Sequence, residues 1–203
     1  MSQKLHHGDL PEGLKFGDAV AVDTEAMGLS PHRDRLCLVQ LSAGNGDAHL
    51  VQFAPGQYNA PRLKALMADA KVTKLFHFAR FDLAMIYQYL GVMAGPIYCT
   101  KIASRLARTF TDRHGLRDLC KDVLGVDISK QQQSSDWGAQ NLTEEQLRYA
   151  ATDVLHLHAL RARLDTMLAR EGRSELAQAA FRFLPTRVWL DLAGWAEQDI
   201  FAH

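Results

Sequence analysis

The spacing of hydrophobic residues along the chain changes near residue 60. Before that point, a continuous apolar run at 19–23 and alternating runs at 35–41 and 48–53 are typical of β-strands. Gly44-Asn45-Gly46-Asp47 has the composition of a hairpin turn between the last two runs. These strands predict an antiparallel meander. Residues 1–17 are polar and glycine-rich, so we interpret them as an N-terminal arm, with strand pairing left open.

After residue 60, patterns of helical period alternate with short strands. We expect helices at 61–70, 79–90, 100–108 and 115–124, and strands at 72–78 and 96–98. The polar stretch 128–141 is expected to be a loop. No repeat or linker is visible, so the pattern predicts one α/β domain with a mixed five-stranded sheet flanked by helices.

The C-terminal part of the chain is expected to be helical. Thr143-Glu144-Glu145-Gln146 has the pattern of a capping box, and we expect its helix to run to about residue 171. A last helical region, from 174 to about 201, should break near Pro185. We therefore divide the chain into the arm 1–17, a main domain at 18–170, and closing helices of the same domain at 171–203.

Composition limits the classes of protein to consider. The 203 residues carry a formal net charge of zero, so any contact with a polyanion must depend on a local patch. Cys37, Cys99 and Cys120 are far apart, which argues against a structural zinc site and a disulfide-rich secreted domain. Neither a signal peptide nor an apolar stretch of about 20 residues is visible. We expect a cytoplasmic protein without membrane contact.

Two carboxylates end the first predicted strand of the main domain. Asp23 and Glu25 are two residues apart, so on a strand they point to the same side. Two like charges held close repel each other unless a cation lies between them, and carboxylate oxygens suit Mg²⁺ or Mn²⁺. Taken alone, the pair is better explained as a polar turn after a strand.

Two further segments carry candidate groups. Asp82 lies in the first turn of a predicted helix, where the helix dipole alone explains an acid. Tyr149 and Asp153 are four residues apart on a helix and share a face, from which both could address one water molecule. Without the other segments, an ordinary amphipathic helix with a tyrosine at the edge of the core is the better explanation of this pair. His77 ends the preceding strand, and we expect it to order a loop by hydrogen bonding.

The joint pattern resembles the ribonuclease D-like branch of the DEDD 3′-5′ exonuclease superfamily, whose members have a ribonuclease H-like fold. The resemblance covers most of residues 18–165. Its three motifs are Asp23-x-Glu25, His77-x-x-x-Phe81-Asp82 and Tyr149-x-x-x-Asp153. Further matches are Gly115-Leu116-x-x-Leu119, Leu124-Gly125-Val126 and Ser135-Asp136-Trp137. Arg148 stands where the sister subclass has histidine, so Tyr149 assigns the chain to the tyrosine subclass.

The resemblance implies a mechanism with two divalent cations, Mg²⁺ or Mn²⁺, about 4 Å apart. Asp23, Glu25 and Asp153 would hold the ion next to the attacking water, and Asp23 would bridge to the second ion. Asp82 would hold the second ion largely through water. Tyr149 would orient the attacking water rather than act as a strong base, because an ordinary phenol has a pKa of about 10 and stays protonated near neutral pH. The products would be nucleoside 5′-monophosphates released from the 3′ end.

The resemblance also implies residues that bind the substrate. Met27, Gly28 and Leu29 would lie beside the terminal base, although a small apolar patch under a loop is an equal alternative. His77 and Lys130 are further candidates. Phosphate contacts are expected from a few of several cations, namely Arg33, Arg35, Arg105, Arg108, Arg113, Arg117 and Lys130.

The expected partner is the single-stranded 3′ end of RNA. A DNA 3′-5′ exonuclease and an inactive nucleic-acid-binding scaffold are the alternatives. Whether the protein is a monomer or a homodimer stays open. The aromatic C-terminal tail is expected to pack on the domain, with self-association as the second interpretation.

Overall fold

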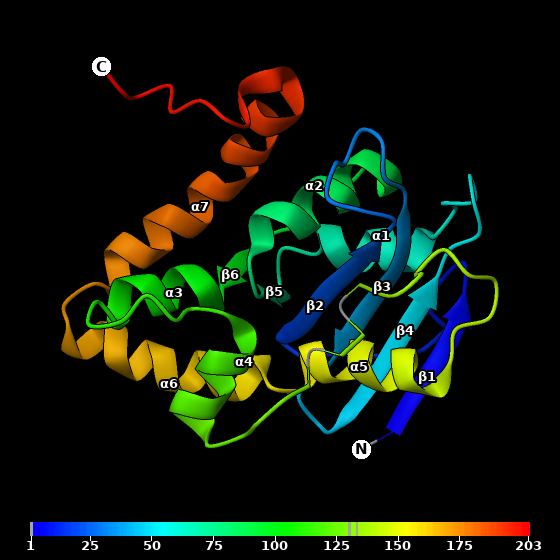
Figure 1. The fold of residues 1–203 in the computed structure, drawn as a ribbon, viewed down its shortest axis with the longest axis horizontal. Coiled ribbons are helices and arrows are strands. Elements are labelled where there is room, and N and C mark those ends of the chain that lie inside the picture. Colours follow the sequence, from blue (N-terminus) through cyan, green and yellow to red (C-terminus); the bar gives the residue numbers. More distant parts are fainter. Residues whose placement is uncertain (1, 130, 133) are drawn as a thin grey trace.

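A computed structural model describes residues 2–129, 131–132 and 134–203, which form one mixed six-stranded sheet with helices on both faces (Figure 1). The order across the sheet is β1-β4-β3-β2-β5-β6. The strands are β1 (Ser2–His7), β2 (Ala19–Ala26), β3 (Leu36–Ser42), β4 (Asp47–Gln52), β5 (Thr73–Phe76) and β6 (Ile97–Cys99). Strands β2, β3 and β4 form the predicted antiparallel meander, and β5 and β6 run parallel to β2.

The predicted count of five strands is wrong by one, because part of the polar arm joins the sheet as β1. This strand pairs in parallel with β4, from Ser2 opposite Asp47 to His7 opposite Gln52. The Ser2 hydroxyl donates to Asp47 at 2.7 Å, and ring nitrogens of His6 and His49 lie 3.0 Å apart. Side-chain contacts thus replace the apolar alternation that would mark a strand in the sequence.

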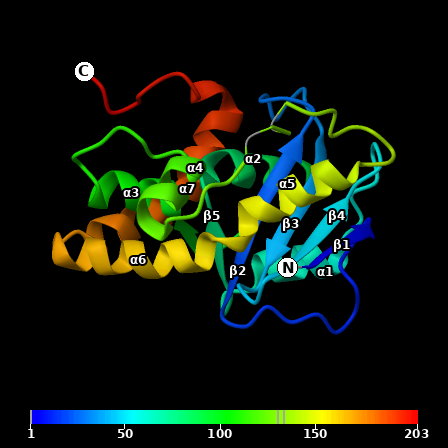
Figure 2. The same cartoon turned by 60° about the horizontal axis from the view of Figure 1, so that its bottom comes forward.

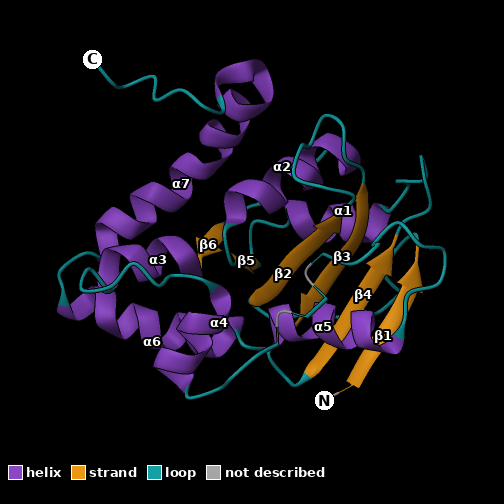
Figure 3. Ribbon diagram, viewed as in Figure 1, coloured by secondary structure: helices purple, strands orange, loops and turns teal. Residues whose placement is uncertain are grey.

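The helices lie close to their predicted positions (Figure 3). They are α1 (Pro61–Ala68), α2 (Ala79–Leu90), α3 (Thr100–Ala107), α4 (Leu116–Leu119), α5 (Glu144–Leu155), α6 (Leu157–Arg170) and α7 (Ser174–Leu190), with π-helical turns η1 (Cys120–Leu124) and η2 (Asp191–Trp195). In the described part of the chain, no helix combines the length and apolar character needed to cross a membrane.

Two boundaries differ from expectation. The helix predicted for 143–171 is divided at His156 into α5, which packs against β2, β3 and β4, and α6, which packs against α3. The break predicted near Pro185 is also wrong. Helix α7 continues through this residue, since Ala177, Phe181, Leu184 and Val188 bury one face of it on both sides of the proline. The chain turns instead at Gly194, where φ is 104°.

Helix α5 lies across one face of the sheet, while α1 and α2 cover the other (Figures 1 and 2). On the α5 side, Leu38 and Leu50 pack with Trp137, Leu147 and Ala150. On the α2 side, a larger core contains neighbouring strand residues with the opposite orientation, such as Val39 and Val51. This packing fixes the end of α5 beside β2, where the candidate catalytic residues meet.

Candidate active site

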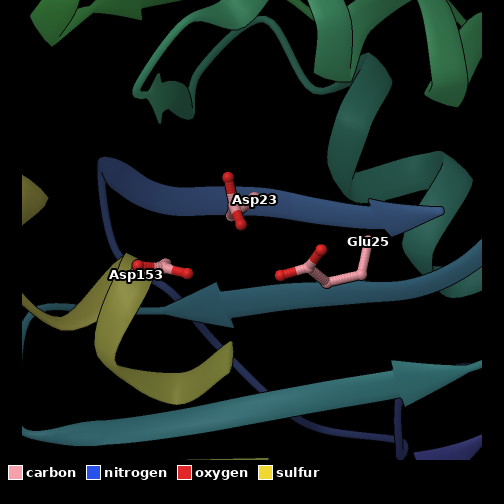
Figure 4. Close-up of side chains that lie close together, drawn as sticks. All are labelled: Asp23, Glu25 and Asp153. Carbon is pink, nitrogen blue, oxygen red and sulfur yellow. The ribbon is translucent and has the colours of Figure 1, made fainter. Parts of the chain in front are cut away.

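Strand β2 and helix α5 bring three carboxylates together. Asp23 and Glu25 project from alternate positions of β2, and Asp153 lies near the end of α5 (Figure 4). One oxygen from each side chain lies within 4.8 Å of the others. No ion pair in the described ranges includes any of the three. The trio therefore concentrates negative charge without a cation from the protein.

The start of α5 determines where Asp153 and Tyr149 point. The predicted capping box is confirmed: the Gln146 backbone N–H donates to the Thr143 hydroxyl at 3.2 Å, and the Thr143 N–H donates to Oε1 of Gln146 at 2.9 Å. The Gln146 amide also donates to the backbone carbonyl of Asp136 at 3.1 Å, so the helix start is joined to the preceding loop.

Burial and mutual repulsion raise the pKa values of these acids. Burial raises the pKa of Asp23 to about 7. The pKa of Glu25 is well above its ordinary value because of burial, followed by the charges of Asp23, Asp153 and Asp82. The pKa of Asp153 is raised by burial and then by Asp23. Such a set of hard oxygen donors favours a divalent cation, which would remove the repulsion.

Asp82 occupies a separate position beside this trio. It lies in the first turn of α2, is only 3% exposed, and accepts a hydrogen bond of 2.7 Å from the Thr24 hydroxyl. Thr24 lies between Asp23 and Glu25 on β2 and faces the α2 side. Burial, followed by the charge of Asp23, raises the pKa of Asp82. The structure thus places a fourth acid near Asp23, outside the group of three.

Gln40 is a buried polar residue next to Asp23 that the sequence analysis did not identify. It stands directly opposite Asp23 in the β2–β3 register and is fully buried. Neither its amide nitrogen nor its amide oxygen has a hydrogen-bond partner among the described residues. A buried amide without partners is costly, so this one fits a site that gains polar ligands when a hydrated cation binds.

The carboxylates open into a cavity of about 290 Å³, which is lined also by Tyr149, His77, Phe78, Lys101 and Arg117. The Tyr149 ring lies 6.1 Å from that of Trp137, and burial raises the pKa of its phenol above the ordinary value. Tyr149 is therefore a neutral hydrogen-bonding group. One His77 ring nitrogen is 2.9 Å from the Thr100 hydroxyl, and burial lowers the His77 pKa to about 3.

The three residues after the first motif have different surroundings. A Cβ at Gly28 would lie 2.4 Å from Oδ2 of Asp34, so a larger residue here would require this carboxylate to shift. A Cβ at Gly138 would likewise lie 2.3 Å from the Met27 sulfur, so Met27 packs closely against this glycine. Leu29 is 85% exposed and lines a groove of about 520 Å³ next to the cavity. Lys130, the remaining predicted substrate contact, lies outside the described residues.

Most of the predicted phosphate-binding arginines have partners within the protein. Arg35 donates to the backbone carbonyls of Phe53 and Gly138, and Arg33 pairs with Asp34. Arg108 and Arg113 both contact Asp122. Arg117 lines the cavity and pairs with Asp127. The other cation in the cavity wall is Lys101, which the sequence analysis did not identify.

Phe78 has an unusual backbone. Its φ of 72° and ψ of 47° place it in the left-handed region at the start of α2, as the one non-glycine residue with positive φ among those described. This conformation costs a non-glycine residue about 1–2 kcal/mol. The side chain is 46% exposed and makes no capping hydrogen bond. No motif marked Phe78 beforehand, because backbone strain leaves no periodic signal.

Comparison with known proteins identifies the group to which this site belongs. Residues 6–169 match a family model described as a 3′-5′ exonuclease. The chain belongs to the 3′-5′ exonuclease family. A ribonuclease D from Gluconacetobacter diazotrophicus is 37% identical over 188 residues, which cover 88% of this chain and 47% of the relative. This exonuclease chain thus spans about half the length of the curated relatives it matches.

Solved structures agree with the family assignment. Brucella melitensis NrnC with bound Mg²⁺ is 54% identical, with a TM-score of 0.96 and coverage of 100% of both chains. The same Brucella protein bound to pGG is 55% identical, with a TM-score of 0.97 and coverage of 100% of this chain and 99% of that one. Escherichia coli RNase D is 28% identical, with a TM-score of 0.73 and coverage of 85% and 45%. The ribonuclease D-like resemblance and the predicted fold class are confirmed.

Proposed function

We propose that this chain is a metal-dependent 3′-5′ exoribonuclease that releases nucleoside 5′-monophosphates from the 3′ ends of single-stranded RNA. The observation that carries the proposal is the convergence of Asp23, Glu25 and Asp153, with oxygens within 4.8 Å of one another, in a chain of the exonuclease family. Three carboxylates from two elements, left without a protein cation, form a centre suited to phosphodiester hydrolysis.

The donor set fits divalent cations. Asp23, Glu25 and Asp153 would hold one ion, and Asp82 beside Asp23 would help to hold a second. When bound, Mg²⁺ or Mn²⁺ supplies positive charge that activates water and stabilises the charge developing on the phosphate and the leaving oxygen. The bound Mg²⁺ in the Brucella relative supports Mg²⁺ as the first ion to test.

The other residues of the cavity have complementary roles. The neutral Tyr149 phenol, four residues before Asp153 on the same helix, orients the attacking water by hydrogen bonding. Lys101 and Arg117 bring positive charge into the cavity wall opposite an anionic substrate. His77, neutral because of its low pKa and fixed by Thr100, orders the cavity wall next to Phe78.

The experiment that tests this function is digestion of 3′- and 5′-labelled RNA and DNA of one sequence, with Mg²⁺, Mn²⁺ or EDTA. The Brucella relative was solved with pGG, so pGG belongs in the substrate panel. We expect hydrolysis that needs the metal, proceeds from the 3′ end and prefers RNA. Preference for DNA would favour a DNA exonuclease instead.

A pair of aspartate variants provides the matched control. Asp23→Ala removes a carboxylate of the trio, and we expect activity to fall by about 10²–10³-fold or more. Asp18→Ala removes an exposed carboxylate that precedes the other end of β2, and activity should stay near wild type. Full nuclease activity in Asp23→Ala would refute the assignment, while no product from the wild-type chain with either metal would favour a binding scaffold.

A further inference from the structure

Phe78 has a strained backbone, and within the described chain neither packing in an apolar core nor a side-chain capping bond compensates for the strain. Its side chain is 46% exposed and belongs to neither apolar core. As the residue before α2 it makes no side-chain capping bond, and a left-handed position there favours glycine or asparagine. Strain that persists without local compensation is typical of functional sites.

The Phe78 ring lines two adjoining spaces, one of which contains the carboxylates. Phe78 lines the cavity that contains Asp23, Glu25, Tyr149 and Asp153, and it also lines the adjoining groove with Leu29. It therefore stands at the junction of these two spaces. A phosphate cleaved at the carboxylates links the last two nucleotides of the strand, so one of their two bases lies within reach of this junction.

We propose that Phe78 is a stacking platform for the base of one of the two 3′-terminal nucleotides, and that it positions the phosphate to be cleaved. This inference rests on the proposed exonuclease function. An aromatic ring offers a flat apolar face to any base, so a platform of this kind binds nucleotides without selecting a sequence. The ring lines the cavity and belongs to neither apolar core of the described chain.

Lys101 supports this role from the next helix. Its ammonium nitrogen lies 4.2 Å from the centre of the Phe78 ring, a cation–π contact that fixes the ring in the cavity wall. Lys101 lines the same cavity as the carboxylates. The pair thus combines an apolar surface for a base with a positive charge for a neighbouring phosphate.

The test combines protein variants with abasic substrates. Short RNAs would carry all bases, an abasic 3′-terminal residue, or an abasic penultimate residue, and kcat and KM would be measured for each. For the complete RNA we expect KM of Phe78→Leu to rise about tenfold or more, with a smaller change in kcat. Phe78→Trp should restore KM. On one of the two abasic RNAs, wild type and Phe78→Leu should become equal.

Controls separate stacking from folding. Phe110 is another exposed phenylalanine with a cation near its ring, Arg108 at 5.7 Å, and it lies outside the active cavity. Phe110→Leu should leave KM unchanged. Phe78→Asn should raise KM while its unfolding temperature stays at or above that of wild type, because asparagine tolerates the left-handed backbone. A purely structural role predicts a lower unfolding temperature instead.

Binding can be followed without hydrolysis. With Ca²⁺ in place of Mg²⁺, RNA carrying 2-aminopurine at the stacked position should lose fluorescence on wild type and Phe78→Trp, but much less on Phe78→Leu. The proposal is overturned if Phe78→Leu binds and cleaves all three RNAs like wild type, or is weakened equally on all three. If the wild-type chain quenches 2-aminopurine but hydrolyses nothing with either metal, the exonuclease function fails while the platform stands.

Discussion

Two clusters of acidic residues in this protein differ in whether arginine side chains neutralise them. In the active site, Asp23, Glu25 and Asp153 meet without an ion pair among the described residues. Between α2, α7 and η2, the Asp191 side chain is also mostly buried, at 12% exposed, but it contacts two guanidinium groups. Arg80 donates to it at 2.5 and 2.8 Å, and Arg187 at 2.5 and 2.8 Å.

This difference indicates a structural role for Asp191 and a functional role for the three carboxylates. Asp191 is neutralised by the chain itself, and the same two arginines also donate to the carbonyls of Trp195 and Ala196, which ties η2 to α2 and α7. The carboxylates of the active site instead carry raised pKa values, which indicates an incomplete site. Removing an acid should therefore have opposite effects on stability at the two places.

The largest expected effect is stabilisation by Mg²⁺, and it should depend on pH. Because the folded pKa of Asp23 is raised from its ordinary value of 3.8 to about 7, Asp23 stabilises the metal-free chain most at low pH, and this contribution is lost as pH rises through 7. Cation binding requires charged carboxylates, so the gain from Mg²⁺ grows over the same range. At about 100 times its dissociation constant, the ion should add about 2.7 kcal/mol at pH 8, or roughly 5–10 °C in Tm.

Thermal unfolding at pH 6 and pH 8, with and without Mg²⁺, measures this effect. Glu25→Gln is the informative variant, since it removes one charge of the trio and keeps the shape. We expect it to melt higher than wild type without metal at pH 8 and to respond less to Mg²⁺. An Mg²⁺ shift of equal size at both pH values would contradict the comparison.

Removal of Asp191 should have the opposite sign. Asp191→Ala leaves two arginines without their shared acceptor, so we expect a loss of about 2 kcal/mol in the free energy of unfolding, between the values for exposed and buried pairs. Chemical denaturation would measure the loss, and Mg²⁺ affinity should not change. Asp165→Ala is the control, because its pair with Arg161 is more exposed and longer, at 3.6 Å. Equal losses in both variants would show that Asp191 has no special role.

The smallest effect is expected at Gln40, the buried amide opposite Asp23. Gln40→Met removes polar atoms that lack partners among the described residues, so the metal-free chain should gain about 1 kcal/mol, while calorimetry should show weaker Mg²⁺ binding. Gln52→Met is the matched control, since the Gln52 amide donates to the carbonyls of Ala139 and Gln140. This control should lose stability. If Gln40→Met instead lowers the stability of the chain, Gln40 has a structural role like that of Asp191.

The spacing of hydrophobic residues predicted the helices and strands that bury one face at regular intervals. Helix α2 begins and ends at the predicted residues 79 and 90, and the meander has its predicted pairing. Strand β1 was not predicted with certainty because its contacts are polar, such as His6 with His49. The division of α5 from α6 at His156 was not visible either, since each half keeps a helical pattern and only their different packing partners separate them.

The candidate site was predictable to the extent that local geometry directs the side chains. Alternation on β2 and the i, i+4 relation on α5 predicted that Asp23 and Glu25 share one side and that Tyr149 and Asp153 share another, while the family resemblance assigned all four to one site. Asp82 depended on the family resemblance, and the structure places it outside the trio. Gln40 and Phe78 could not be predicted, because one depends on cross-strand register and the other on a strained backbone angle.

Through the capping box at the start of α5, Thr143 determines the direction of catalytic side chains farther along the helix. An α-helix turns by about 100° and advances about 1.5 Å per residue, so the residue at which the helix starts sets the rotational phase of all that follow. Thr143 and Gln146 fix that phase, and Asp153 lies ten residues after Thr143. A start displaced by one residue would rotate Asp153 away from β2 while leaving every atom of its side chain intact. A substitution at Thr143 can thus impair the active site by changing the direction of Asp153, without changing any catalytic side chain.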